Sequence, residues 1–298
     1  MQLALTILMD GLIYASWLFV VALGLTLVFG VLKILNIAHG SLYAIGAYVA
    51  ASLVTLFASW GLGGHFALLA MLLAAVGVAL VMGPLMERYL LRLFYARDEV
   101  VLLLVTYALF LILEDAVKLI WGVNPYYVSE PYQLFGNVAF ASLFYVGYDF
   151  ALIGLAIACG IAVWFALNRT RSGKVVLAVI FSREMSASMG VNVDKVHMIA
   201  FTLGVFLAAV GGAFTAPMIS VQPGISVSVI IVSFAVIIIG GLGSIEGAAI
   251  GAVIVGLARA AAVHLMPEAE LFSIYLVMAA VLIFRPEGLF QRAAARKI

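Results

Sequence analysis

The feature that most constrains this chain is a succession of long apolar stretches with few charges inside them. A helix that crosses the hydrocarbon core of a bilayer needs about 20 mainly apolar residues. By this criterion the 298-residue sequence predicts nine spans, near residues 5–31, 37–59, 65–86, 99–120, 149–167, 196–218, 226–242, 247–266 and 270–285. With 66% hydrophobic and 10% charged residues, against about 25% charged residues in soluble domains, the chain is predicted to be an all-α polytopic membrane protein.

Two of the nine stretches leave the number of spans open between eight and nine. The stretches 226–242 and 247–266 are short and rich in glycine, and we expect either full spans or half-helices and re-entrant segments packed inside the protein. The glycines within 240–243 are expected to break the helix just before Ser244. Broken helices at membrane depth usually line a polar cavity, so this break is a candidate part of a solute pathway.

The longest polar segment runs over residues 168–195 and carries several Lys and Arg residues. Within it, Lys174 to Met189 is predicted to form one amphipathic helix that stops at Gly190, where glycine readily adopts the left-handed conformation of a helix end. Such a helix is a docking surface for a soluble partner. No polar stretch is long enough to bury a core of its own, so residues 1–298 are predicted to form a single membrane domain.

The basic residues predict which side each loop faces. They gather in a loop near 88–97, in the segment 168–195 and in the tail at 292–297. Because cytoplasmic loops carry an excess of Lys and Arg, all three are expected to be cytoplasmic, and the N-terminus and the loop 121–133 to lie outside. The apolar run from Gln133 to Tyr145 is too short to span and is predicted to be an external helix.

The sequence contains no recognisable catalytic or metal-binding pattern. A phosphate-binding loop needs G-x-x-x-x-G-K-[ST], but Asn168 stands at the position of the first glycine before Gly173-Lys174, and Val175 follows the lysine. We therefore expect neither ATP hydrolysis nor a metal site in this chain, and no cofactor of its own. There is also no clustered basic surface of the kind that binds nucleic acid. The four histidines are scattered, with no H-E-x-x-H motif: His39, His65, His197 and His264.

Two charges, Glu114 and Arg259, fall inside predicted spans at similar heights. Each intramembrane charge costs about 2.5–3.5 kcal/mol on insertion scales, so each needs a partner or water. One arrangement is an ion pair between Glu114 and Arg259 across two helices. In the other, Lys118 satisfies Glu114 and Asp115 on its own helix, and Arg259 is left to another subunit or to a wet cavity.

Polar residues also stand where the second predicted span begins, at Asn36 and His39. An asparagine at a helix start is most often a cap, and a histidine there can face lipid headgroups, so a role in a gate is the alternative interpretation. Small residues recur at intervals of three and four in this span and again near 247–256, which predicts close approach of helix backbones.

Four sequence runs resemble, in order and spacing, the permease subunits of branched-chain amino-acid ABC transporters, in particular the smaller, LivH-type subunit. The runs are LTLVFGVLKILNIAHGSLYAIGAYVA (25–50), SREMSASMGVNVDKVHMIAFTLGVFLAAVGGAF (182–214), IIGGLGSIEGAAIGAVIVGL (238–257) and FRPEGLF (284–290). The resemblance covers nearly the whole chain and implies the ABC importer permease fold.

The resemblance also implies the partners and the location of the protein. It implies an importer of the bacterial inner membrane in which this chain and a second, LivM-type permease form the channel. Two cytoplasmic ATPase subunits would bind ATP and Mg, and a periplasmic binding protein would deliver the substrate. Beside branched-chain amino acids, the family includes carriers of urea, short amides and aromatic or other carboxylates. Its members usually carry an acidic residue near the position that Arg259 occupies in this chain, so we expect the charge of a substrate or partner to be handled differently here.

By the same resemblance, individual residues acquire expected roles. The residues expected to couple the permease to the ATPase are Arg183, Glu184, Ser188, Gly190 and Asn192. The residues expected at two glycine-marked helix starts along the pathway or gate are Asn36, His39, Gly40, Gly243, Ser244 and Gly247.

Two other classes of membrane protein, a stand-alone transporter or channel and an intramembrane enzyme, are the alternatives to an ABC permease. A stand-alone secondary transporter or channel would need a coupling-ion site, commonly of buried carboxylates facing a cavity, for which Asp10, Glu114 and Asp115 are the candidates. An intramembrane enzyme would need a catalytic constellation, and the sequence shows none that we recognise.

Overall fold

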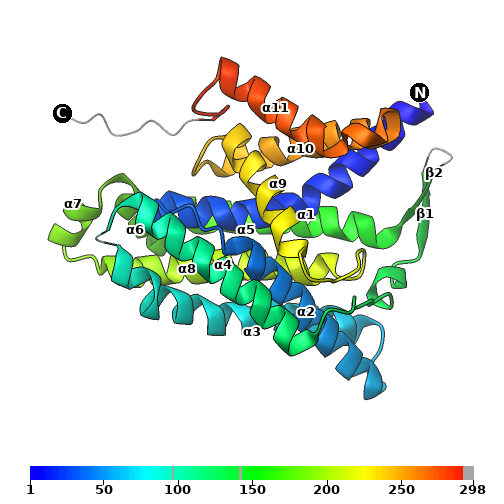
Figure 1. Ribbon diagram of the computed structural model, residues 1–298, viewed down its shortest axis with the longest axis horizontal. Helices are drawn as coiled ribbons and strands as arrows, with labels where there is room; N and C mark the ends of the chain where they lie inside the picture. The colour runs from blue at the N-terminus through cyan, green and yellow to red at the C-terminus, as the bar shows by residue number, and fades with distance from the viewer. Residues whose placement is uncertain (96, 141–142, 291–298) are drawn as a thin grey trace.

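The computed structural model describes residues 1–95, 97–140 and 143–290. Within them the chain is almost entirely helical, as Figure 1 shows. The helices are α1 (Gln2–Leu32), α2 (His39–Ser59), α3 (His65–Tyr89), α4 (Glu99–Trp121), α5 (Gly147–Arg169), α6 (Arg171–Phe181), α7 (Arg183–Ser188), α8 (Val193–Thr215), α9 (Ile225–Gly240), α10 (Ile245–Leu265) and α11 (Glu270–Phe284). Short 3-10 turns lie at Leu91–Phe94, Pro131–Gln133 and Pro267–Ala269, and two strands at β1 (Asn137–Phe140) and β2 (Leu143–Val146).

Eight helices in the described residues are long and apolar enough to span a membrane, and α9, with 16 residues, is shorter. The expectation of eight or nine spans with a glycine break is therefore confirmed. The break falls as predicted, since α9 ends at Gly240 and α10 begins at Ile245. However, α10 is a full-length helix of 21 residues, so it is not the half-helix that was one of the two alternatives.

The short helix α9 runs between the same two ends of the molecule as its longer neighbours. Its start lies beside the loop after α4, where Tyr126 and Val221 form an isolated antiparallel β-bridge. Beyond its other end, a Cβ placed on Gly243 would lie 3.5 Å from the Cα of Gly30, near the end of α1. Counting α9, the described residues pass nine times between these ends. This number of passes places the residues directly after α11 at the same end as α6 and α7.

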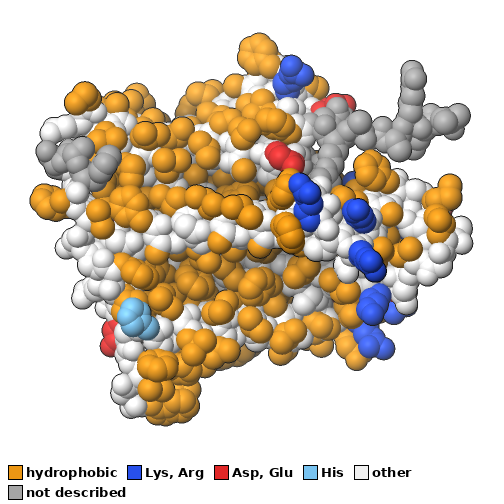
Figure 2. Space-filling view, turned by 180° about the vertical axis from the view of Figure 1, so that it is seen from behind, with side chains coloured by type: hydrophobic (Ala, Val, Ile, Leu, Met, Phe, Trp, Pro, Cys, Tyr) orange, Lys and Arg blue, Asp and Glu red, His pale blue; other side chains and the backbone are white. Residues whose placement is uncertain are grey.

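These two ends of the molecule differ in composition. Figure 1 shows α6 and α7 at one end, and the start of α1 with β1 and β2 at the other. Figure 2 shows a column of Lys and Arg side chains at the first end and hydrophobic side chains over most of the body between the two. We call these the basic end and the hairpin end. A broad apolar surface of this kind suits a body surrounded by lipid.

The centre of the molecule is the long helix α1, which packs against α5, α8, α9 and α10. Glycines permit these contacts, because a Cβ on Gly256 of α10 would overlap the carbonyl oxygen of Gly11 in α1. In the same way, a Cβ on Gly212 of α8 would overlap the carbonyl oxygen of Tyr43 in α2. The predicted close approach of backbones at small residues is confirmed.

The prediction of an external helix between Gln133 and Tyr145 is wrong. This segment contains the end of a 3-10 turn and then an antiparallel pair, in which Asn137 of β1 pairs with Val146 of β2. The 3-10 turn ends at Gln133. Gly136 follows with a φ of 63°, and the residues after it are rich in aromatic and β-branched types that favour strands. Apolar content alone did not distinguish a short helix from two strands.

The prediction of one helix from Lys174 to Met189 is also incorrect. The segment forms two helices, α6 and α7, because the backbone is extended at Ser182 (φ −155°, ψ 105°). The Ser182 hydroxyl accepts a hydrogen bond from the amide of Met185 at 3.3 Å and so caps the start of α7, as serine commonly does. The predicted left-handed residue after the helix is present, since Gly190 has φ of 85°.

Candidate functional site

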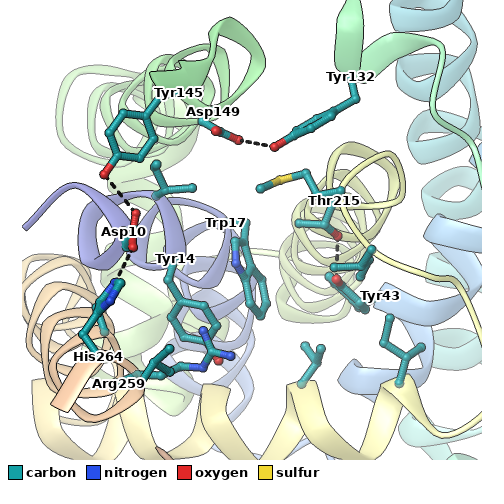
Figure 3. A pocket seen from close by; sticks show the side chains of 17 residues that line it. Asp10, Tyr14, Trp17, Tyr43, Tyr132, Tyr145, Asp149, Thr215, Arg259 and His264 are labelled. Atoms are coloured by element: carbon teal, nitrogen blue, oxygen red, sulfur yellow. Dashed lines mark hydrogen bonds and ion pairs between the residues drawn. The ribbon is translucent and has the colours of Figure 1, made fainter. Parts of the chain in front are cut away.

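A cavity of about 430 Å³ opens at the hairpin end, between helices that are far apart in sequence. This volume suits a small solute. As Figure 3 shows, aromatic and charged side chains point into the cavity from several elements. Its polar lining is Asp10 and Tyr14 of α1, Tyr43 of α2, Tyr132, Tyr145, Asp149 of α5, Thr215 of α8, and Arg259 and His264 of α10. Its apolar lining includes Ile13, Trp17, Met218, Ile219, Ile225, Val229 and Val263.

On one wall, Asp10 lies between two hydrogen-bonding partners. His264 Nε2 lies 2.6 Å from Asp10 Oδ2, and the Tyr145 hydroxyl donates to Asp10 Oδ1 at 3.1 Å. Burial, and then the charge of Asp10, raises the pKa of Tyr145 to about 12, so its phenol keeps its proton and acts as a donor at neutral pH. This contact ties strand β2 to the start of α1 and closes one side of the cavity.

On another wall, Asp149 is a buried carboxylate in the first turn of α5, next to the backbone of Val146. Its residue is 6% exposed, and the Tyr132 hydroxyl donates to its Oδ1 at 3.3 Å. Burial, and then the charge of Asp149, raises the pKa of Tyr132 to about 12. Among the described residues, no Lys, Arg or His nitrogen lies within 4.0 Å of Asp149. Asp149 is therefore a carboxylate on the cavity wall that has no ion-pair partner in the described part of the chain.

Arg259 lies on the opposite side of the cavity from Asp149 (Figure 3). Its guanidinium forms an ion pair with Glu270, in the first turn of α11, and stacks over the ring of Tyr14 with 4.1 Å between Cζ and the ring centroid. Stacking of this kind favours a cation near an aromatic face. Arg259 also lines a second cavity of about 350 Å³ on the other side of Tyr14 and Trp17, so it forms part of the wall between the two.

The pair between Glu114 and Arg259, one of the two arrangements predicted, does not form, and Glu114 has a different role. Its carboxylate accepts hydrogen bonds from the amide of Gly224, at 2.6 Å, and from the hydroxyl of Ser226. Both donors lie at the start of α9, where free amides and the helix dipole favour an anion. Lys118 pairs with Asp115 at 3.0 Å, as the alternative predicted, but not with Glu114.

The residues predicted for a pathway or gate lie outside the cavity lining. Asn36 is fully buried, and neither polar atom of its side chain has a hydrogen-bond partner among the described residues. The cap interpretation is incorrect, because Ala38 occupies the N-cap of α2 with no side-chain cap. His39 is also fully buried, and its Nε2 donates to the carbonyl oxygen of Val21 at 3.1 Å. It therefore does not face headgroups.

The remaining predicted pathway residues form close contacts between helices. A Cβ on Gly40 would overlap the carbonyl oxygen of Ser226, and one on Gly247 would overlap that of Gly240. Ser244 caps α10, since its hydroxyl accepts from the amide of Gly247 at 3.0 Å. Gly243 has φ of 82° and lies beside Gly30. The two helix starts thus pack α2 and α10 against α9, and α1 lies beside both.

The residues predicted to contact an ATPase lie at the basic end, in and after α7. Arg183 and Glu184 are in the first turn of α7 and are exposed, with the Arg183 guanidinium 5.9 Å from the ring centroid of Tyr95. Ser188 ends α7 and Gly190 follows it, both exposed. The Asn192 side chain caps α8 by accepting from the amide of Lys195 at 3.0 Å.

Sequence reasoning did not find the cavity, although one signal was present. Asp10, Tyr14 and Trp17 are spaced so that they share one face of α1, and a polar and aromatic face inside an apolar span indicates a cavity or an interface. All three line the cavity. Nothing in the sequence indicated that Tyr132, Tyr145 and Asp149 would face them.

The fold and this cavity define a multi-pass membrane protein of the solute-permease class. Residues 7–284 match the sequence profile of the family described as the branched-chain amino acid transport system / permease component, and the chain belongs to this family.

Three relatives match over nearly their whole length. The permease BraD of the high-affinity branched-chain amino acid transport system of Pseudomonas aeruginosa is 27% identical, with 98% of this chain and 97% of that protein aligned. The corresponding LivH of Escherichia coli (strain K12) is 25% identical over 97% and 96% of the two chains. A probable branched-chain amino acid permease LivH of Methanocaldococcus jannaschii is 28% identical over 95% and 91%. The predicted family is confirmed, and these relatives are transport permeases rather than enzymes.

Proposed function

We propose that this chain is the channel-forming permease of an ATP-driven importer that moves branched-chain amino acids, or closely related small polar solutes, across the bacterial inner membrane. The observation that carries the proposal is the family match over residues 7–284. It is supported by a solute-sized cavity with charges of both signs at one end of a nine-pass helical body.

The proposed orientation follows from the column of Lys and Arg side chains (Figure 2). Because cytoplasmic loops are rich in these residues, the basic end faces the cytoplasm and the hairpin end faces the periplasm. The N-terminus is then periplasmic and the C-terminus cytoplasmic. In this orientation the cavity receives solute from a periplasmic binding protein.

The proposed source of energy is a pair of ATPase subunits bound at the basic end. The sequence lacks a phosphate-binding loop, so ATP and Mg are bound by those partners rather than by this chain. Helices α6 and α7 form the surface that receives them, and a second, LivM-type permease completes the channel. A stand-alone transporter would instead drive uptake with an ion gradient and would need no ATPase.

Uptake measured in proteoliposomes tests this proposal. The chain reconstituted alone should give no ATP-dependent accumulation of leucine, and the chain reconstituted with its second permease, both ATPases and the binding protein should accumulate leucine only with ATP. Accumulation by the chain alone, driven by ATP or by an imposed ion gradient, would contradict it.

The coupling segment is tested by substitution in α7 and after it. Glu184→Ala and Gly190→Ala should lower ATP-driven uptake about tenfold or more while leaving membrane insertion unchanged, because Glu184 is exposed and Gly190 has positive φ. ATP hydrolysis and leucine uptake should be measured on the same vesicles. The matched controls lie at the hairpin end: Glu130→Ala removes an exposed carboxylate there, and Gly61→Ala replaces a glycine with φ of 75°. Normal coupling in both α7 variants would remove this segment from the proposal.

A further inference from the structure

An apolar groove of about 240 Å³ lies between α5 and α8, toward the basic end, and every residue that lines it is apolar. Helices α5 and α8 both pack against α1, and Leu27 of α1 lies in the groove between them. The lining residues of α5 are mostly small and recur at intervals of three and four: Cys159, Ala162, Val163 and Ala166. This spacing places them on one face of α5, and their small size leaves the space that forms the groove.

The groove runs along α5 toward the basic end and is open on its outer side. Cys159 and Ala166 are seven positions apart, which is about 10 Å along a helix at about 1.5 Å per residue. Half of a hydrocarbon core is about 15 Å thick. On the α8 wall, Ile199 and Leu203 are 43% and 48% exposed. The groove therefore faces the surroundings of the body, at the depth of the acyl chains of one leaflet.

Two cations stand above the groove at the basic end, one on each wall. Arg169 follows Ala166 by three positions on α5, and Lys195 precedes Ile199 by four positions on α8. Each cation therefore shares a helix face with a residue that lines the groove. Both residues are exposed, and neither forms an ion pair in the described part of the chain. An anion at this position would meet two basic side chains that are not already paired.

The dimensions of the groove favour a flexible chain over a helix of another subunit. A volume of about 240 Å³ over a length of about 10 Å gives a mean cross-section of about 24 Å². A helix with its side chains is about 10–12 Å across, which corresponds to about 80–110 Å². A helix can therefore lie over the groove but cannot enter it, whereas a single file of methylene groups can. Within a bilayer such contacts depend on van der Waals packing, which a narrow groove provides on several sides of the chain.

We propose that this groove is a binding site for an anionic phospholipid, with one acyl chain between α5 and α8 and the phosphate on Arg169 and Lys195. Basic sites between membrane helices suit anionic headgroups, and a guanidinium matches a phosphate with two parallel hydrogen bonds. Because Val176 of α6 also lines the groove, the bound chain contacts α5, α6 and α8 together. The site is separate from the solute cavity and does not depend on which solute is carried.

Native mass spectrometry of the purified full-length chain tests the site. The chain is released from micelles that contain equal amounts of phosphatidylglycerol and phosphatidylcholine with the same acyl chains. One phosphatidylglycerol should remain bound per chain, with a preference of about tenfold or more over phosphatidylcholine, because two cations act on its net negative charge. Equal retention of the two lipids would overturn the assignment of the headgroup.

Substitutions in the wall test whether the acyl chain occupies the groove. Ala162→Phe fills the groove from α5 and should lower retention of phosphatidylglycerol about tenfold or more. Ala158→Phe is the matched control, because Ala158 is exposed on the same helix but does not line the groove. Leu203→Trp fills the groove from α8 and serves as the test if Ala162→Phe does not fold. Retention equal to that of the control would overturn the proposal.

Substitutions at the mouth test the headgroup contacts. R169Q/K195Q should abolish the preference for phosphatidylglycerol, whereas R97Q/R285Q, which removes two exposed arginines outside the groove, should retain it. An equal loss in both double variants would show attraction to the basic end as a whole and would overturn the site. The same spectra show whether a second copy of the chain covers the groove: a dimer without bound lipid, lost in Ala162→Phe, would also overturn the proposal.

Discussion

The starts of α2 and α10 look alike in sequence but differ in how their polar groups are satisfied. Both have a polar residue followed by glycine, and both glycines, Gly40 and Gly247, contact a backbone carbonyl of α9 or its flank. At the start of α10 the Ser244 hydroxyl caps the helix. At the start of α2 the Asn36 amide is fully buried and has no partner among the described residues.

The start of α10 is thus a capped helix end, whereas the start of α2 buries an amide that has no partner among the described residues. An unpaired buried amide costs roughly 1–3 kcal/mol. The loop that contains Asn36 is held by Thr106 of α4, whose hydroxyl donates to the carbonyl oxygen of Leu35 at 3.2 Å.

The largest effect on the stability of the protein is expected at the close contact between α9 and α10. Gly247→Val should lower the apparent melting temperature of the detergent-solubilised protein strongly or prevent folding, because its side chain would overlap the backbone of Gly240. Overpacking typically costs about 1–3 kcal/mol and sometimes more.

A matched control for this glycine lies in α3. Gly77→Ala meets no atom within 4 Å of its new Cβ and should be neutral or slightly stabilising, since alanine favours a helix interior by about 0.5–1 kcal/mol. If Gly247→Val were as stable as Gly77→Ala, the start of α10 would not depend on close packing against α9.

The second prediction is a gain in stability rather than a loss, and it distinguishes the start of α2 from the start of α10. Asn36→Leu should raise the melting temperature, because it removes an unsatisfied buried amide that costs roughly 1–3 kcal/mol. Thr106→Val is the contrast, since it breaks the hydrogen bond to Leu35 and should lower the melting temperature. A loss of stability in Asn36→Leu would show that the amide is satisfied in this state.

The smallest effect is expected at the cap of α10. Ser244→Ala should lower stability by about 1 kcal/mol, the usual contribution of an N-cap, and Ser244→Asp should retain most of it. Both variants are measured by thermal unfolding alongside the wild-type chain. If Ser244→Ala had no effect and Asn36→Leu were destabilising, the start of α2, rather than the start of α10, would be the one whose polar side chain contributes to stability.

The sequence predicted the spans well because a span depends on one quantity, the apolar content of about 20 consecutive residues. It could not predict the neighbours of each helix. Glu114 and Arg259 were placed at similar heights, but height does not specify which way a side chain points, and the structure pairs them with Ser226 and Glu270 instead.

The cavity was missed for the same physical reason. Asp10 and Asp149 are far apart along the chain and face one cavity because α1 packs against α5 and α10 together. Helix periodicity predicts which residues share a face of one helix, such as Asp10 and Tyr14, but not which faces meet. The hairpin that carries Tyr145 was predicted to be a helix, so its contact with Asp10 was also beyond reach.

The end of α9 has a consequence for the order in which this protein is assembled. The last carbonyl groups of a helix lack partners within the helix, and those of Ile239 and Gly240 accept from the amides of Leu289 and Phe290, each at 2.9 Å. These donors follow α11, so they leave the ribosome only after two further helices have been made. The last turn of α9 is therefore completed late, and a chain that ends before Leu289 should insert its spans but leave this turn unfinished and vulnerable to quality-control proteases.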